Sequence, residues 1–258
     1  MNTIIKSPRI RPVPAVSRAI AILRLLGKVR TPMGVNAIAQ SLELIPSTCL
    51  HILRALVQEK LVAFDAETKH YRLGAGMVTL ARNALEANAF PVLVQSVLDR
   101  LSTQWGVTAI GVDVGDPEQM VVVALSRSNI PFRLHVDVGS VFPALLSATG
   151  RLVAAFGAQP DAELKRRFQK LRWDKPLDYD DWRKEVAFAK KHQYSVDRNR
   201  YIAGISISAV PVLDPEGKIT HTIVCASLMD ALNKTQMSQL IKQMQEEARA
   251  VAAQIFAE

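Results

Sequence analysis

Residues 35–73, VNAIAQSLELIPSTCLHILRALVQEKLVAFDAETKHYRL, decide the fold of the first part of the chain. Apolar side chains recur at helical spacing on both sides of a break that ends at Pro46, a residue that suits the first turn of a helix. Asn36 is available to cap the first of the two helices. Two apolar runs then flank the polar segment 65–69, as in a hairpin. This order predicts a winged helix-turn-helix.

The second of these helices has a face that suits the major groove of DNA. Short hydrogen-bonding side chains, Ser47 and Thr48, lie near its start, and a cation, Arg54, lies further along. We expect Leu50 to touch a thymine methyl group. The cations expected to meet mainly phosphates are Arg18, Arg54, Lys69 and Arg72. The candidate DNA-binding residues are Arg18, Ser47, Thr48, Leu50, His51, Arg54, Lys69 and Arg72.

The charge of the chain is concentrated in the same region. Residues 1–80 hold eleven Lys and Arg against four Asp and Glu, whereas the remaining residues hold 21 against 20. Nearly all of the formal net charge of +8 therefore belongs to the segment with the helix-turn-helix pattern. Because neutralising phosphates supplies most of the non-specific affinity for DNA, this excess indicates double-stranded operator DNA as a partner. A merely solvated basic surface is the alternative.

Length and composition predict about two ordinary globular domains for 258 residues with 49% hydrophobic content. No uncharged apolar run reaches the roughly 18 residues of a membrane span, and the first residues lack the apolar stretch of a signal peptide. We therefore expect a cytoplasmic protein with no membrane partner. The two cysteines, Cys49 and Cys225, are expected to be buried thiols in a reducing compartment.

The remaining segments alternate between helical and strand patterns. An amphipathic helix at 13–29 could pack on the DNA-binding unit or also offer a second side to another copy of the chain. Hairpin-linked strands flanked by helices predict an antiparallel sheet in an α+β fold. The expected domains are 1–75 for DNA binding, 76–89 as a linker helix and 90–258 as a second domain. Expected strands are 107–114, 120–125, 132–138, 194–197, 205–213 and 219–228, and expected helices are 77–88, 91–104, 147–156, 161–171, 181–192 and 235–256.

Several short motifs occur in one order along the chain: Val16-Ser17-Arg18-Ala19, Pro46-Ser47-Thr48, His51-Ile52-Leu53, Tyr71-Arg72-Leu73-Gly74, Ala148-Thr149-Gly150-Arg151, Tyr194-Ser195-Val196-Asp197 and the run from Ala209 to Asp214. In these motifs the chain resembles the IclR-type bacterial transcriptional regulators over nearly its whole length. The resemblance implies a winged helix-turn-helix joined by a helix to a GAF-like domain that binds a small-molecule effector. It also implies a homodimer or a dimer of dimers, and control of a catabolic or transport operon.

The resemblance also implies an effector pocket, in which this chain departs from the family's pattern. Ile207 stands where a cysteine is frequent, and Val224 and Ala226 stand where the family often has serines that hold a small carboxylate. Because an unpaired carboxylate is costly to desolvate, an aromatic or apolar effector is expected. The alternative is that these apolar residues merely fill the core of the sheet. The implied effector-binding residues are Leu134, Phe142, Ala148, Thr149, Asp197, Ile205, Ile207, Val224 and Ala226.

Two polar residues near this pocket have open alternatives. Asp197 could receive a hydroxyl or an amine of the ligand, or it could cap a turn. Arg200 could pair with an anionic ligand, or it could be a solvated cation of a loop.

Two other functions are possible for such a chain: an enzyme with an appended DNA-binding domain, and a DNA binder without an effector. The five histidines are scattered, and no phosphate-binding loop or nucleophile elbow is present. His135 and Asp137 would share one face of a strand, where an exposed polar pair is the commoner explanation. A DNA binder without an effector would not need residues 90–258. We therefore expect no catalytic residue, no metal and no cofactor.

Overall fold

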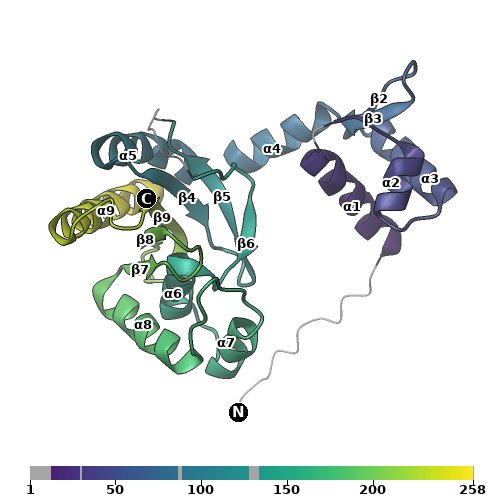
Figure 1. Cartoon of the computed structure of the whole chain (residues 1–258). Helices are drawn as coiled ribbons and strands as arrows, with labels where there is room; N and C mark the ends of the chain where they lie inside the picture. Colours follow the sequence, from purple (N-terminus) through teal and green to yellow (C-terminus); the bar gives the residue numbers. More distant parts are fainter. Residues whose placement is uncertain (1–12, 30, 87–88, 128–133, 258) are drawn as a thin grey trace, which may run out of the picture. The chain divides into compact units, whose positions relative to one another are not determined.

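The structure of this protein is a computed structural model, which describes residues 13–29, 31–86, 89–127 and 134–257 (Figure 1). The chain divides into two compact units, residues 1–87 and 88–258. The segment expected as a linker, 76–89, begins in the first unit and ends at the start of the second. None of the helices in the described ranges is long and apolar enough to cross a membrane.

The first unit is a winged helix-turn-helix, as expected. Its helices enclose one apolar core, and its three strands form a small antiparallel sheet in the order β1-β3-β2. The two-residue strand β1 was not predicted. Asn36 does not cap α2, because Gly34 occupies the N-cap position and no side chain accepts a bond there. The elements are α1 (Pro14–Val29), β1 (Met33–Gly34), α2 (Val35–Ser41), α3 (Pro46–Gln58), β2 (Val62–Phe64), β3 (His70–Leu73) and α4 (Gly76–Glu86).

The second unit contains a six-stranded antiparallel sheet with helices, which confirms the α+β fold. The strand order is β6-β5-β4-β9-β8-β7. Its elements are α5 (Phe90–Trp105), β4 (Thr108–Asp113), β5 (Gln119–Leu125), β6 (Val141–Pro143), α6 (Ser147–Phe156), α7 (Asp161–Phe168), α8 (Tyr179–His192), β7 (Ser195–Arg198), β8 (Ile205–Leu213), β9 (Ile219–Leu228) and α9 (Lys234–Ile255).

The prediction of a strand at 132–138 is wrong for those of its residues that the structure describes. Residues 134–138 form no strand, and residues 132–133 lie outside the described ranges. The edge of the sheet is occupied by β6 instead, which pairs with β5 through Met120 and Phe142. His135 and Asp137 therefore do not share a strand face.

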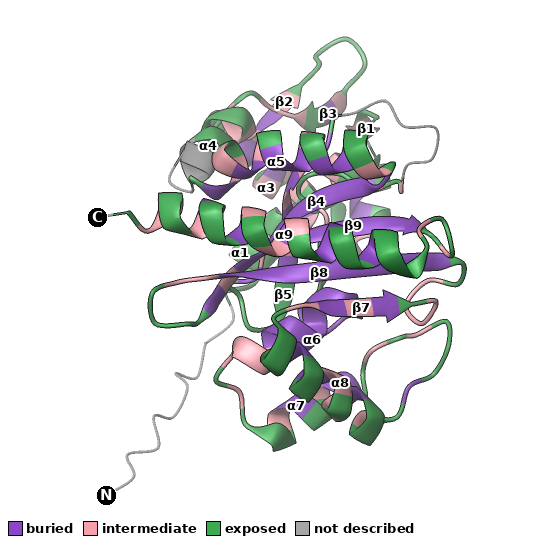
Figure 2. Ribbon diagram, turned by 90° about the vertical axis from the view of Figure 1, so that its left-hand side faces the viewer, coloured by how far each residue is buried: buried purple, intermediate pink, exposed green. Residues whose placement is uncertain are grey.

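The helices of the second unit divide between the two faces of the sheet (Figures 1 and 2). We call the face covered by α6, α7 and α8 the α6 face, and it carries Ile207 and Val224. We call the face covered by α5 and α9 the α9 face, and it carries Val210 and Ile223. Because side chains alternate along a strand, neighbouring residues of β8 and β9 serve different faces.

Candidate functional site

Helix α3 exposes the side that was predicted to read DNA. Ser47, His51 and Arg54 are exposed and lie at intervals that place them on one side of the helix, with Thr48 and Leu50 half-buried beside them. The opposite side of α3 is buried in the core of the first unit. Contact of these residues with DNA stays a prediction. Further exposed cations are Arg18 on α1, Lys69 at the hairpin and Arg72 on β3.

The tip of the hairpin is held by its own backbone. The Asp65 carboxylate accepts hydrogen bonds from the backbone N–H groups of Glu67, at 2.9 Å, and Thr68, at 3.2 Å. These bonds lower the pKa of Asp65. Lys69 follows with a φ of 58°, a left-handed conformation that completes the turn. The tip therefore places the Lys69 side chain in solvent without help from other elements.

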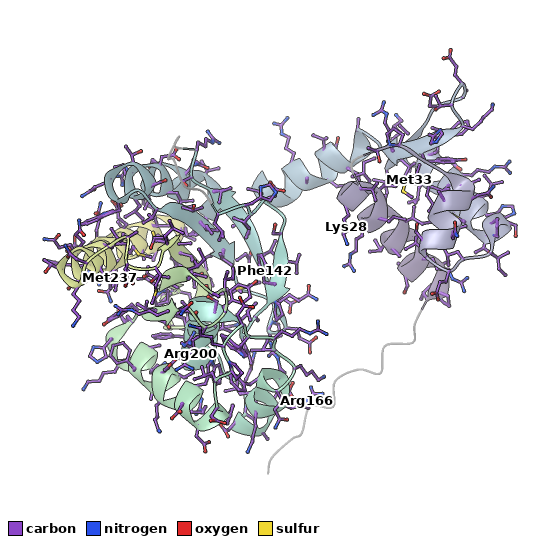
Figure 3. All side chains as sticks on the ribbon, in the orientation of Figure 1. Lys28, Met33, Phe142, Arg166, Arg200 and Met237 are labelled. Carbon is purple, nitrogen blue, oxygen red and sulfur yellow. The ribbon has the colours of Figure 1, made fainter. Side chains whose placement is uncertain are left out.

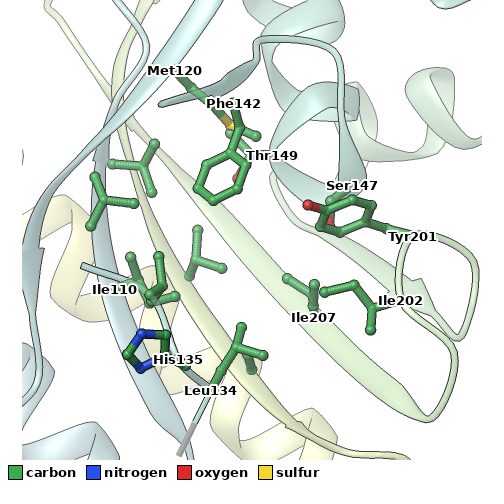
Figure 4. A pocket seen from close by; sticks show the side chains of 15 residues that line it. Ile110, Met120, Leu134, His135, Phe142, Ser147, Thr149, Tyr201, Ile202 and Ile207 are labelled. Carbon is green, nitrogen blue, oxygen red and sulfur yellow. The ribbon is translucent and has the colours of Figure 1, made fainter. Parts of the chain in front are cut away.

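A cavity of about 180 Å³ lies on the α6 face of the sheet (Figure 4). Side chains from five strands and from the start of α6 converge on it. Among its lining residues are six from the predicted effector set: Leu134, Phe142, Thr149, Ile207, Val224 and Ala226. The residues that sequence reasoning missed are Ile110, Val112, Met120, Val122, His135, Val136, Ser147, Tyr201 and Ile202.

Some of the missed residues carried a usable signal. Val122 lies on β5, and Ile110 and Val112 alternate along β4, which pairs with β9. Ile110 is directly opposite Val224 in that pairing. The alternation would have identified these residues if the order of the strands had been known. Strand order depends on contacts between distant segments, and the local pattern does not contain it.

Two predicted pocket residues, Ala148 and Ile205, lie beside the cavity without lining it. Both are buried in the same hydrophobic cluster of the α6 face. Ile205 is the first residue of β8, one alternation before Ile207, so the cavity ends before reaching it. Ala148 is fully buried between the lining residues Ser147 and Thr149. Neither residue lines the cavity, so the contact of Ala148 and Ile205 with an effector stays a prediction.

Ser147 is the polar side chain of the cavity that has the most unusual environment. Its hydroxyl is buried and has no hydrogen-bond partner among the described residues, and its φ is 57°. Such strain tends to occur at functional sites. A Cβ on Gly150 would lie 1.9 Å from the carbonyl carbon of Leu145, so only glycine allows this tight entry to α6. Arg151 fixes the turn further by donating to the Ser147 carbonyl at 2.7 Å.

Asp197 does not line the cavity, and its contact with a ligand stays a prediction. Its buried carboxylate forms an ion pair with Arg151, at 3.0 Å between Nη1 and Oδ2. The other oxygen accepts from the backbone N–H groups of Arg200, at 3.2 Å, and Tyr201, at 3.0 Å. Asp197 therefore holds the loop that carries Tyr201 to the cavity. The Arg200 side chain donates to the carbonyl of Pro176, at 3.1 Å.

The chemistry of the cavity is apolar with a few neutral polar groups. Burial raises the pKa of the Tyr201 hydroxyl, which favours its neutral form. The Thr149 hydroxyl lies 3.5 Å from that of Thr222, which is a weak contact, and His135 is exposed. Within the described ranges, no cluster of three His, Cys, Asp or Glu residues could hold a metal ion. The arrangement can enclose an apolar body and bond one polar group at Ser147.

Comparisons with known proteins match both units. A family model described as IclR helix-turn-helix domain matches residues 15–66, and one described as Bacterial transcriptional regulator IclR C-terminal matches residues 92–253. The curated protein named Probable transcriptional regulator SauR, from Cupriavidus necator, is 27% identical over 212 residues. That match covers 77% of this chain and 80% of the relative.

Solved structures show the same fold. An IclR transcriptional regulator from Alicyclobacillus acidocaldarius has a TM-score of 0.80 at 24% identity, covering 94% of this chain and 99% of that chain. An IclR homologue from Microbacterium hydrocarbonoxydans, complexed with 4-hydroxybenzoate, has a TM-score of 0.78 at 17% identity. It covers 95% of this chain and 100% of that chain.

Proposed function

The chain belongs to the IclR family of bacterial transcriptional regulators, and from that premise we propose that its DNA binding responds to an aromatic or otherwise apolar small metabolite. The matched families are transcriptional regulators and not enzymes, which confirms the expectation that this chain is not an enzyme. We assign DNA binding to residues 1–75, the linker to 76–89 and effector binding to 90–258. The observation that carries the proposal is the α6-face cavity, whose described lining contains no lysine, arginine or carboxylate.

The size and lining of this cavity favour a ring over a small acid. An apolar cavity of about 150 Å³ is enough to bind benzene, and this one measures about 180 Å³. Burying a ring gains about 25 cal/mol per Å², whereas a small carboxylate would lack the charged partner that offsets its desolvation. The Ser147 hydroxyl provides one polar contact. A structural relative, the Microbacterium homologue, is complexed with an aromatic compound, 4-hydroxybenzoate.

A direct test measures operator affinity with and without defined compounds. The operator would be selected from random DNA with the full-length protein, and its binding followed by fluorescence anisotropy. We expect a neutral aromatic compound such as phenol to bind and to change operator affinity by about 5- to 150-fold, the usual range of coupling. Glyoxylate and glycerol are expected to have no effect. If only the two hydrophilic compounds bind, the proposed effector class is wrong.

The double variant Val224→Ser, Ala226→Ser tests which face binds the effector. Two hydroxyls in the cavity should weaken the aromatic compound and improve glyoxylate binding, because they offer the donors that a carboxylate needs. Val196→Ser is the matched control, since Val196 is half-buried on β7 and packs on the α9-face core. Calorimetric titration of both proteins compares the ligand profiles. Equal profiles for the double variant and the control would contradict the assignment.

The DNA-binding assignment has its own test. Lys69→Gln should weaken all DNA sequences alike and lower the slope of log affinity against log salt by about one, because one phosphate contact is lost. Leu50→Ala should instead relax preference at one base pair of the half-site. Lys242→Gln, an exposed position on α9, is the control with the same charge change. A salt slope equal to that of the control would remove Lys69 from the interface.

We further propose that the regulator acts as a homodimer or a dimer of dimers. One winged domain makes few phosphate contacts, so paired reading heads are needed to find an operator. Helix α1 offers an exposed apolar side for pairing, with Val16 at 59% and Ile20 at 42% exposure. Sedimentation of the full chain should show a dimer or larger, and Val16→Glu with Ile20→Glu should weaken the assembly. A wild-type monomer that occupies the operator would contradict this proposal.

A further inference from the structure

A second hollow, with a volume of about 380 Å³, lies on the α9 face of the sheet. It is bordered by the end of β7, the start of β8, the end of β9 and the first turn of α9. Figure 2 shows α9 beginning beside these strand ends. Met237 of α9, labelled in Figure 3, lies at its border. No residue of this hollow lines the α6-face cavity.

Three polar side chains form a row across the floor of this hollow. In the register of the sheet, Arg198 is opposite Ser206, and Ser206 is opposite Ser227. The three residues therefore belong to adjacent strands and share one face. Further along β8 and β9, the same face carries apolar residues such as Val210 and Ile223. These three polar residues therefore lie at one end of a face that is otherwise apolar.

The middle member of this row is buried and unsatisfied. Ser206 is 5% exposed, and its hydroxyl has no hydrogen-bond partner among the residues that the structure describes. Burying a hydroxyl without a partner costs free energy, so a buried group of this kind calls for an explanation. Because Ser206 borders the hollow, a ligand atom placed there would supply the missing partner.

The first turn of α9 adds donors and positive charge above the row. In a capping box, the backbone N–H of Asn233 donates to the Gln236 side chain at 3.0 Å, and the backbone N–H of Gln236 donates to the Asn233 side chain at 2.9 Å. The first N–H groups of a helix have no partner within the helix, so those of Lys234 and Thr235 remain for a ligand. The helix dipole makes this end positive, and a helix of 22 residues carries it in full.

The charged side chains around the hollow favour an anion. Arg198 and Lys234 are exposed cations at its border, and no ion pair of either is found within the described residues. Asp230 is the one carboxylate at the border. Two cations, the helix start and the serine hydroxyls together outweigh its charge. A guanidinium and hydroxyl groups are the donors that bind phosphate and carboxylate oxygens in proteins.

We propose that this hollow is a second ligand site, which binds the phosphate or carboxylate group of a small organic molecule. The oxyanion lies between Arg198 and the first turn of α9 and accepts a hydrogen bond from Ser206. The volume exceeds that of an oxyanion alone, so the body of the molecule rests against Leu228 and Leu232. The site is separate from the α6-face cavity and differs from it in preferring charge.

The test uses the full-length protein with inorganic phosphate and acetate as probes, at constant ionic strength maintained with chloride. Binding to the folded state raises the melting temperature, and calorimetric titration gives the affinity. A response to phosphate alone identifies a phosphate site, and a response to acetate identifies a carboxylate site. If neither probe exceeds the effect of chloride, the proposal is overturned.

Two matched substitutions locate the binding. Arg198→Gln should weaken the responding probe by about tenfold, since a charge-assisted bond is lost. Lys242→Gln removes the same charge from an exposed position of α9 outside the hollow, and should change affinity less than about twofold because exposed charges are screened. Equal losses in the two variants would show a general effect of net charge and would overturn the site.

Ser206→Ala separates binding from a structural role. Because the hydroxyl lacks a partner, its removal should leave the free protein as stable as the wild type or more stable, while weakening the probe. Reduced stability with unchanged probe affinity would mean that Ser206 serves the fold, and this result would contradict the proposal. Since the probes do not involve the α6-face cavity, the outcome is independent of the aromatic effector.

Discussion

The two faces of the six-stranded sheet are built by the same strands and have different interiors. On β9, Val224 borders the empty space of the α6-face cavity, and its neighbour Ile223 is fully buried against α5 and α9. The difference lies in the covering helices. Helix α9 has 22 residues and supplies an apolar stripe along its length, whereas α6 has ten residues. On the α6 face the cavity lies beside Ile207 and Val224 in the middle of the strands, whereas the hollow of the α9 face lies at the strand ends, beside the start of α9.

The largest expected effect concerns the ion pair that supports the α6 face. Asp197→Ala leaves the buried Arg151 with an unpaired charge on that side, so the free energy of unfolding should fall by about 3–5 kcal/mol. Glu185→Gln removes another carboxylate partner of Arg151, but one with a side chain that is 38% exposed, and should cost less than about 1 kcal/mol. Urea unfolding of both variants makes the comparison. Similar losses would mean that burial does not distinguish the two partners.

A matched pair of isoleucines tests the difference in packing directly. Ile223→Ala should cost about 2–5 kcal/mol, because it creates a cavity in a filled core. Ile207→Ala should cost less, about 1–2 kcal/mol, because this side chain already borders empty space and loses fewer contacts. Denaturant unfolding provides both values. If Ile207→Ala costs as much as Ile223→Ala, the α6 face is as tightly packed as the α9 face.

The smallest effect is a dependence on pH that arises from the α9 face. His221 is buried, with its ring stacked on Phe90 at 4.1 Å, and Nε2 lies 3.8 Å from Asp113. Burial lowers the pKa of His221 below 6.5, and Asp113 opposes this only in part. The unfolded chain therefore takes up this proton at a higher pH than the folded protein. The contribution of His221 to the free energy of unfolding should be fully present above the pKa of the unfolded chain. It should be lost as pH falls through the lowered pKa of the folded protein.

The measurement for His221 is the free energy of unfolding between about pH 8 and about pH 5. His221→Gln should flatten its decline at acid pH, relative to the wild type. His192→Gln, at an exposed position, is the control and should leave the decline unchanged. A decline that survives in His221→Gln to its full extent would assign the pH dependence to other groups.

The sequence predicted those elements whose pattern is local. The bounds of β8, β9 and α6 agree with expectation, because apolar alternation or helical spacing continues between clear turn residues. The segment 134–138 has similar alternation without forming a strand. The edge position goes to β6, where the turn at Gly139, with a φ of 89°, brings Ser140 to accept from Val122 at 2.9 Å. Local pattern does not determine which of two segments obtains the partner strand.

The site was predicted in part for a similar reason. The apolar residues Ile207 and Val224 were placed near a pocket by resemblance, and both line the cavity. The role of Asp197 was left open because its partner, Arg151, is 46 residues away and on another element. Nor does the sequence reveal that Ser147 adopts a left-handed conformation with an unpaired hydroxyl. These features arise from tertiary packing and depend on the whole sheet.

The two cysteines allow the opening of each unit to be measured by the rate at which its thiol is modified. Cys49 is buried in the core of the first unit and Cys225 in the second, and both are free thiols whose pKa is raised by burial. A thiol reagent can modify each one only when its own unit opens, because the thiolate must reach solvent. The modification rate at each position therefore reports the opening of one unit separately. Mass spectrometry of the unaltered protein could thus compare how operator DNA and an effector protect the two units, without any introduced probe.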